Sequence, residues 1–155
     1  MPIRRMTEAD AAVVADLATQ LGYPASAAAI VRRLRRIATA PDHALFVAEA
    51  GEGAVVGWVH VHLSWLLAAE PVAEVWGLVV DGRHRGEGFG RRLMAAAEAW
   101  AAAEGFGTLR LRSNAVRHGA HAFYERLGYR VVKTSLAFEK TLAASDLADK
   151  PDQAG

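Results

Sequence analysis

A glycine- and arginine-rich run follows a strongly apolar stretch in the middle of the chain. The run reads Asp81-Gly82-Arg83-His84-Arg85-Gly86-Glu87-Gly88-Phe89-Gly90-Arg91. Its glycines permit positive φ angles and a close approach of the backbone to a ligand, and the unpaired N–H groups that open the following helix favour an anion. Arg83, Arg85 and Arg91 can add charge-assisted hydrogen bonds. The run predicts a phosphate-binding loop, and the alternative is a surface turn that needs glycines only for its geometry.

Two familiar phosphate-binding motifs do not fit this run. A dinucleotide-binding fingerprint needs a third glycine where Arg91 stands, and an acidic residue where the next strand has Arg110 and Arg112. A P-loop needs Gly-Lys-Ser/Thr, and the first lysine of the chain is Lys133. A dehydrogenase and a P-loop NTPase are therefore disfavoured, while a nucleotide-binding fold of another kind stays as an alternative.

Two residues outside the loop have side chains suited to acid–base chemistry. Glu74 interrupts an apolar strand, where burial would raise the pKa of its carboxyl group toward the range useful for a base. Its alternative is a solvated or arginine-paired carboxylate. Tyr124 carries a phenol that can donate a proton, or it is a core aromatic residue beside Phe123. Three histidines are reserve bases whose spacing indicates no metal site: His60, His62 and His121.

Composition narrows the class of protein further. The 155 residues correspond to one domain, and 52% hydrophobic with 23% charged residues indicate a folded globular chain. Because 18 basic residues nearly balance 17 acidic ones, no net field favours nucleic acid or an anionic membrane. The absence of cysteine excludes a disulfide framework, a thiolate metal site and a cysteine nucleophile.

The sequence also gives expectations about cellular location and about the extent of the domain. No apolar core of a signal peptide follows the basic residues near the start, and no run reaches the roughly 18 apolar residues of a membrane span. We therefore expect a cytoplasmic protein. Residues 1–142 are expected to form one domain, and residues 143–155, which are small, polar and contain proline, a flexible tail.

Hydrophobic periodicity predicts a mixed α/β order of elements. Strands are predicted over residues 3–6, 44–49, 55–63, 73–80, 108–112, 129–134 and 136–140. Helices are predicted over residues 7–21, 26–37, 91–104 and 117–127. The nearly continuous apolar run 73–80 is typical of a strand at the centre of a sheet that is covered on both faces. The arginines of the second helix are expected to face water.

Three ordered motifs resemble those of the GNAT family of N-acetyltransferases. The loop Arg85-Gly86-Glu87-Gly88-Phe89-Gly90 resembles its Arg/Gln-x-x-Gly-x-Gly/Ala acyl-CoA loop. Residues 74–80 look like its central strand, and residues 120–129 look like its second signature. The resemblance covers residues 1–142. It implies an α+β fold with a central mixed, mostly antiparallel sheet of about six to seven strands, about four flanking helices and a splayed central strand pair.

The same resemblance implies roles for individual residues around acetyl-CoA. The backbone of Leu78, Val79 and Val80 would bind the pantetheine arm. The pyrophosphate would lie on the N–H groups of the loop and the helix start, that is, of Arg85, Gly86, Glu87, Gly88, Phe89, Gly90 and Arg91. Tyr124 would be the general acid and Glu74 the base. The chain departs from the family where an asparagine is frequent seven residues before the tyrosine, because Arg117 stands there and Asn114 lies nearby, so either is expected to replace that cofactor contact.

The implied activity is transfer of an acetyl group from acetyl-CoA to a primary amine of a small molecule or peptide, by direct attack in a ternary complex. The first two helices and residues 64–71 would form the acceptor pocket, with Trp65 and Trp76 as walls. Alternatives are an acyl-CoA-binding sensor without turnover, and an acetyltransferase of protein N-termini or lysines. A homodimer is a further expectation, because dimers are common in the family.

Overall fold

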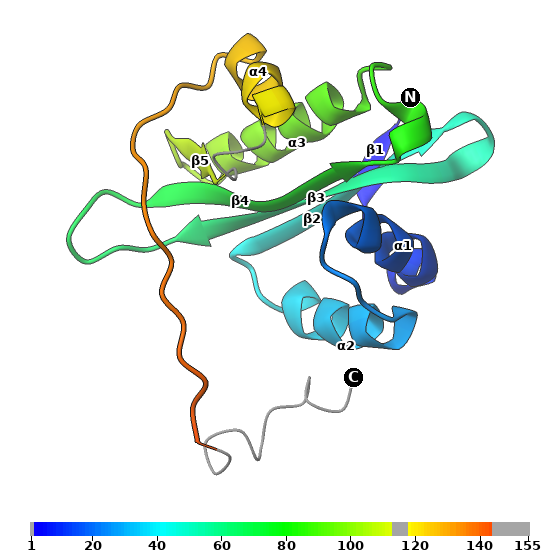
Figure 1. The fold of residues 1–155 in the computed structure, drawn as a ribbon, viewed down its shortest axis with the longest axis horizontal. Coiled ribbons are helices and arrows are strands. Elements are labelled where there is room, and N and C mark those ends of the chain that lie inside the picture. Colours follow the sequence, from blue (N-terminus) through cyan, green and yellow to red (C-terminus); the bar gives the residue numbers. More distant parts are fainter. Residues whose placement is uncertain (1, 113–117, 144–155) are drawn as a thin grey trace. The chain divides into compact units, whose positions relative to one another are not determined.

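A computed structural model describes residues 2–112 and 118–143 of the chain. The chain divides after Arg112 into two compact units (Figure 1). The first unit contains a sheet with helices on both faces, and the second contains one helix followed by an extended segment. No helix in these described ranges is both long and apolar enough to span a membrane.

A five-stranded sheet organises the first unit. Its strands are β1 (Ile3–Arg5), β2 (His43–Ala50), β3 (Ala54–Ser64), β4 (Val72–Val80) and β5 (Leu109–Leu111). They lie in the order β1-β2-β3-β4-β5, and every neighbouring pair is antiparallel except β4 and β5. The predicted mixed, mostly antiparallel sheet is confirmed, as is the hairpin that joins β2 to β3.

Local signals in the sequence place the helices of this unit. The helices are α1 (Ala11–Leu21), α2 (Ala27–Ala38) and α3 (Phe89–Ala103). A 3-10 turn over Glu8–Asp10 leads into α1, and there the Asp10 carboxylate accepts a hydrogen bond from the Thr7 N–H at 2.8 Å. The Ser26 hydroxyl accepts one from the Ala29 N–H at 3.1 Å and so caps α2. These caps satisfy N–H groups that the helices leave unpaired, which fixes where each begins.

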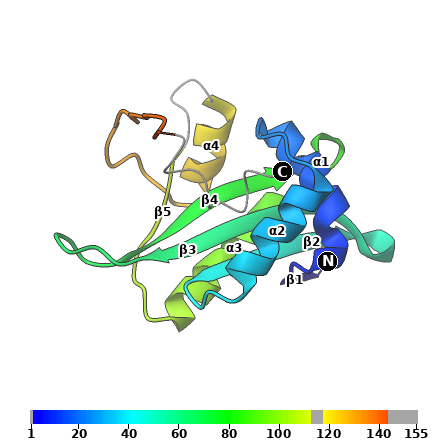
Figure 2. The ribbon, with the colours of Figure 1, turned by 90° about the horizontal axis from the view of Figure 1, so that it is seen from below.

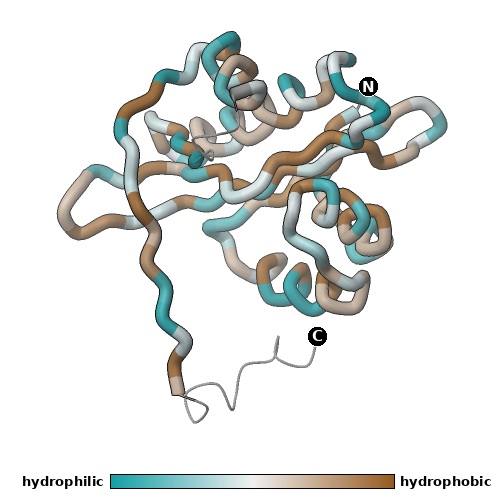
Figure 3. The backbone as a smooth tube through the Cα atoms, viewed as in Figure 1, coloured by the Kyte–Doolittle hydropathy of each residue, from teal (hydrophilic) through white to brown (hydrophobic). Residues whose placement is uncertain are grey.

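The helices cover opposite faces of the sheet. In Figures 1 and 2, α1 and α2 lie on one face and α3 lies on the other. Alternation along β3 explains this arrangement, because Val59 and Val61 are fully buried, whereas Trp58, His60 and His62 point to the other face and are only partly buried. In Figure 3 hydrophobic residues recur along the strands, and the helices carry both hydrophobic and hydrophilic residues. One face of β3 thus builds core, while the other offers polar groups beside α1 and α2.

Strand β4 lies next to the sheet edge and is only partly paired. It pairs with β3 along its length, but with β5 only from Ala73 to Val75. Strand β4 therefore lies inside the sheet as expected, but its neighbour β5 is an edge strand of only three residues. The register between β3 and β4 also shifts at His60/Val61, which leaves Trp76 as an extra residue on β4. Such bulges bend a strand and redirect its side chains.

The second unit differs from expectation after its helix. Helix α4 (His118–Arg126) forms as predicted and brings the described helices to four. The strands expected over residues 129–134 and 136–140 are absent from this described segment, so the sheet has five strands rather than six or seven. Alternating apolar residues favour a strand, but a strand also requires a neighbour for its N–H and C=O groups. Without that neighbour Leu136 and Phe138 are 81% and 91% exposed.

Candidate active site

The glycine-rich loop joins β4 to α3 with the geometry of an anion-binding turn. Gly86 and Gly88 have φ angles of +81° and +90°, which only glycine adopts readily, and Gly88 caps α3. Added Cβ atoms at either position would meet nothing within 4 Å, so the loop surface there is open. The first N–H groups of α3 have no acceptor within the helix, and the helix dipole adds partial positive charge. The loop can therefore hold a phosphate group on its backbone.

Asp81 and Arg83 form a fixed pair at the beginning of the loop. The buried Asp81 carboxylate accepts hydrogen bonds from the Arg83 backbone N–H at 3.0 Å and from the Arg83 guanidinium at 2.8 Å. These hydrogen bonds hold the pKa of Asp81 well below its usual range. The Arg83 side chain is 85% exposed beside the loop while it makes this ion pair. Arg85 and Arg91 are exposed side chains beside the open loop.

Beyond Val75, strand β4 presents a backbone edge that β5 does not cover. Residues 77–80, which include Leu78, Val79 and Val80, pair with β3 on one side and with no strand of the described residues on the other. Figure 1 shows β5 beside only the beginning of β4. The free edge runs directly into the phosphate-binding loop. An extended ligand with amide groups can therefore add to this edge as a further strand would.

A chain of polar contacts connects Glu74 to the surface. Glu74 is half-buried, and its Oε1 accepts a hydrogen bond from the Ser64 hydroxyl at 3.0 Å. The Ser64 oxygen lies 3.3 Å from His62 Nδ1, and His62 Nε2 lies 3.3 Å from an Asp42 carboxylate oxygen. The four side chains provide a path along which a proton taken up by Glu74 can move toward partly exposed Asp42.

Three histidines gather beside this path. His43 Nδ1 lies 2.9 Å from His60 Nε2, and the rings of His43 and His62 stand 4.3 Å apart. The grouping of Asp42 and His43 with His62 was not indicated by the sequence, because His62 is on β3, whereas His43 begins β2 and Asp42 precedes it. The ligand atoms of Asp42, His43 and His62 lie within 4.8 Å of one another. A zinc ion with bonds of about 2.0–2.1 Å would have to draw the His43 and Asp42 atoms, 4.0 Å apart, closer together.

The neutral state of His60 gives a prediction about stability. Burial, together with His43 and His62, lowers the pKa of His60 from 6.5 to about 4. The unfolded chain takes up a proton near pH 6.5 and the folded chain only near pH 4, so the free energy of unfolding falls as the pH falls through this window. We expect His60 to contribute a loss of about 3 kcal/mol at most. Urea unfolding at pH 7, 5.5 and 4.5 measures it.

A His60→Phe variant separates this contribution from that of other titrating groups. It should lose less free energy of unfolding between pH 7 and 4.5 than the unmodified chain, whereas a His84→Gln variant, at the surface, should follow the unmodified chain. Equal losses in the His60→Phe variant and the unmodified chain would show that the pKa of His60 is the same in the folded and the unfolded chain.

Comparison with known proteins identifies a family whose match includes β4, the glycine-rich loop and α4. The family model described as the acetyltransferase (GNAT) family matches residues 12–129. The chain belongs to the GNAT acetyltransferase family. It is an N-acetyltransferase that uses acetyl-CoA as the acetyl donor. The predicted family, fold class and cofactor are thereby confirmed.

Similar proteins cover most of this GNAT chain. An aminoglycoside N(6')-acetyltransferase type 1 of Stenotrophomonas maltophilia is 31% identical over 147 residues, which are 92% of this chain and 95% of the relative. An aminoalkylphosphonate N-acetyltransferase of Salmonella typhimurium is 36% identical over 91 residues, 58% of each chain. The crystal structure of an aminoglycoside 6'-N-acetyltransferase from Acinetobacter haemolyticus has a TM-score of 0.78 at 19% identity, covering 92% of this chain and 100% of that one.

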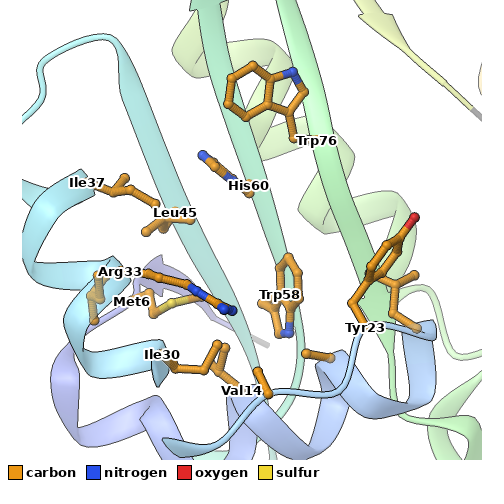
Figure 4. Close-up of a pocket in the computed structure, with 14 residues that line it drawn as sticks. Met6, Val14, Tyr23, Ile30, Arg33, Ile37, Leu45, Trp58, His60 and Trp76 are labelled. Carbon is orange, nitrogen blue, oxygen red and sulfur yellow. The ribbon is translucent and has the colours of Figure 1, made fainter. Parts of the chain in front are cut away.

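The GNAT chain has a pocket between α1, α2 and the sheet (Figure 4). Its volume is about 270 Å³, and Trp76 lines it as expected. Trp65 does not, because its ring packs against Phe106 at 5.1 Å. Trp58 provides the second indole instead, and it fits there because Gly77 has no side chain: an added Cβ would lie 2.7 Å from Trp58 Cζ3. The pocket also includes Arg33, although the arginines of α2 were expected only to face water.

The remaining site residues lie in or near the second unit of the GNAT chain. Tyr124 is on α4, where its ring contacts Phe123 at 5.1 Å and Tyr129 at 6.1 Å between centroids. Asn114 and Arg117, the expected cofactor contacts, lie outside the described residues. His121 is on α4 as well, and so belongs to a different unit from His60 and His62.

Proposed function

We propose that this N-acetyltransferase transfers the acetyl group of acetyl-CoA to the primary amine of a small molecule, with both substrates bound at once. The relatives support a small acceptor, since by their names they act on aminoglycosides and aminoalkylphosphonates. The pocket beside β4 agrees in size, because about 270 Å³ is just below the range of sites for drug-sized ligands.

The free edge of β4 is the observation that carries the cofactor part of the proposal. The pantetheine amides would bind the backbone of Leu78, Val79 and Val80, where β5 no longer pairs with the strand. The pyrophosphate would lie on the N–H groups from Arg85 through Arg91, at the positive end of α3. Asn114 or Arg117 would add the contact that the family commonly makes through an asparagine.

The proposed chemistry uses the backbone of this edge together with a role for Tyr124 that the family signature implies. The amine nitrogen attacks the thioester carbon, so that a C–N bond forms and the C–S bond breaks. A backbone N–H near Val79 would stabilise the oxyanion of the tetrahedral intermediate. Tyr124 donates its phenolic proton to the departing CoA sulfur, a role that rests on the resemblance of residues 120–129 to the family signature.

Glu74 takes the proton that the amine loses. The contacts from Glu74 through Ser64 and His62 to Asp42 support this assignment, because they offer the proton a route away from the attacking nitrogen. No acyl-enzyme is needed, and a chain without cysteine has no thiol on which to form one.

The proposal also covers the extent of the catalytic domain, the location of the enzyme in the cell and its oligomeric state. Residues 1–142 would act as one catalytic domain, with residues 143–155 as a tail. Use of acetyl-CoA suits a cytoplasmic enzyme, and the family likeness favours a homodimer, which light scattering of the purified chain will test.

Thermal unfolding of the purified chain tests the cofactor site. Acetyl-CoA at a hundred times its Kd should stabilise the fold by about 2.7 kcal/mol, which for a chain of this length raises Tm by roughly 5 to 10 °C. ATP and NAD at the same concentration should have little effect. A larger shift with either nucleotide than with acetyl-CoA would contradict the assignment of the loop.

Turnover is measured by release of CoA with a panel of amines. Because the chain contains no cysteine, CoA is the only thiol in the assay, so a thiol reagent reports it without background from the enzyme. Release that depends on a small amine supports the proposal. Release that occurs only with peptides would assign the acceptor to protein substrates instead.

A further inference from the structure

The acceptor pocket has an unusual balance of charge for an enzyme that binds amines. Its 14 lining residues include no aspartate or glutamate, and most are apolar. The positively charged residue among them is Arg33, from α2. The sheet side supplies Trp58, His60 and Trp76. A ligand here meets an apolar wall, one cation and the indole groups, and no carboxylate to pair with an ammonium group.

The charge of Arg33 is not neutralised by an acidic residue in the described part of the chain. Two residues further along α2, Arg35 forms an ion pair with Glu8 at 2.8 Å. Arg33 forms no ion pair with any carboxylate among the described residues. In Figure 4 its guanidinium group extends into the pocket toward the indole of Trp58. Its five N–H donors are in a fork that suits a carboxylate or a phosphonate.

Trp58 adds a second donor that lacks an acceptor. Its Nε1 is buried and has no hydrogen-bond partner in the described part of the chain. A buried N–H group without an acceptor destabilises the empty protein, so a ligand that offers an acceptor gains more there than at a solvated donor. Arg33 and Trp58 both line this pocket, and its lining residues include no acidic side chain to accept a hydrogen bond from either.

We propose that the acceptor amine carries an anionic group, a carboxylate or a phosphonate, which binds between the Arg33 guanidinium and the Trp58 indole N–H. This inference rests on the proposed function and decides a point that the relatives leave open, since aminoglycosides are polycations and aminoalkylphosphonates carry an anion. A polycation would bring ammonium groups to a pocket that contains Arg33 and no carboxylate, a juxtaposition of like charges that lowers affinity.

Binding of four probes to the full chain, in the presence of CoA so that no turnover occurs, tests the inference. The probes are 2-aminoethylphosphonate, 3-aminopropanoate, propylamine and kanamycin. The first two share an amine and an anion and differ in the anion, propylamine lacks the anion, and kanamycin is a polycation. Isothermal titration gives each Kd. Indole N–H resonances of the ¹⁵N-labelled chain, with that of Trp58 assigned through a Trp58→Phe variant, report where the ligand binds.

At least one anionic amine should bind about ten times more tightly than propylamine and kanamycin, and it should shift the Trp58 indole resonance. An Arg33→Ala variant should weaken its binding about tenfold or more and leave that of propylamine unchanged. The matched control is Arg36→Ala, one turn further along α2 and outside the pocket lining. Alanine favours the helix at both positions, so both variants should fold.

The outcomes separate the inference from the proposed function. If an anionic amine binds in an Arg33-dependent way but releases no CoA from acetyl-CoA, the pocket assignment holds and the proposed function fails. If amines release CoA equally well with and without an anion, the proposed function holds and the inference is wrong. Tightest binding of kanamycin, or failure of both anionic amines to bind the folded chain, also overturns the inference.

Discussion

A Tyr124→Phe variant is expected to release CoA about 100 times more slowly than the unmodified enzyme, as a fall in kcat. The phenol would donate a proton to the CoA thiolate as it leaves, and phenylalanine keeps the ring but lacks the donor. Affinity for acetyl-CoA should not change, because the hydroxyl acts on the leaving group and not on the bound thioester. Steady-state assays give kcat, and isothermal titration gives the Kd of acetyl-CoA.

Tyr129 provides a matched control for this variant. It is in the same unit and its ring contacts that of Tyr124. A Tyr129→Phe variant removes the same group from a neighbouring ring and should keep its kcat. An unchanged kcat in the Tyr124→Phe variant would show that another group protonates the thiolate. A joint loss of kcat and acetyl-CoA affinity would assign Tyr124 to cofactor binding instead.

Replacing Glu74 by glutamine should lower kcat by about two orders of magnitude at neutral pH, since the amide cannot take the proton of the attacking amine. Glutamine keeps the size of the side chain and can still accept the hydrogen bond from Ser64. The fold and acetyl-CoA binding are therefore expected to persist.

Two further variants make the Glu74 result decisive. Glu70→Gln removes an exposed carboxylate of the neighbouring loop and should leave kcat unchanged. Ser64→Ala breaks the path toward His62 while leaving the base in place, so a smaller loss, of several-fold, is expected. If Glu74→Gln retains full activity and the pH profile of the unmodified enzyme, the base is a different group, and His60 and His62 become the next candidates.

Much of the fold could be predicted from the sequence because its signals are local. Thr7 with Asp10, and Ser26, mark helix starts through hydrogen bonds that span three residues. Gly22 ends α1 with a φ of +102°. The phosphate-binding loop belongs to the same class, because positive φ at Gly86 and Gly88 and the start of α3 arise within one short segment.

Residues that meet across the fold could not be predicted in this way. His43 and Asp42 come beside His62 only because β2 pairs with β3 in one register. Trp58 replaces Trp65 in the pocket because a bulge at Trp76 and the bare backbone of Gly77 make room for its ring. Arg33 looks like one of several solvated arginines until α2 is packed against the sheet. The sequence did carry one signal for this pocket. Polar and apolar residues alternate along β3, and the partly polar face of this strand forms one wall of the pocket.

The sequence by itself determined the family, the order of the elements down to α4, and the loop at which a phosphate can bind, since these depend on residue types at short, fixed spacing. Only the tertiary structure decided that the pairing of β4 with β5 ends at Val75, that Ser64 connects Glu74 with His62, and that Arg33 and Trp58 share one pocket. The physical reason is that strand register and helix packing are set by burial across the whole sheet. A shift of one residue in a strand would turn Trp58, Ser64 or Glu74 to the opposite face of the sheet.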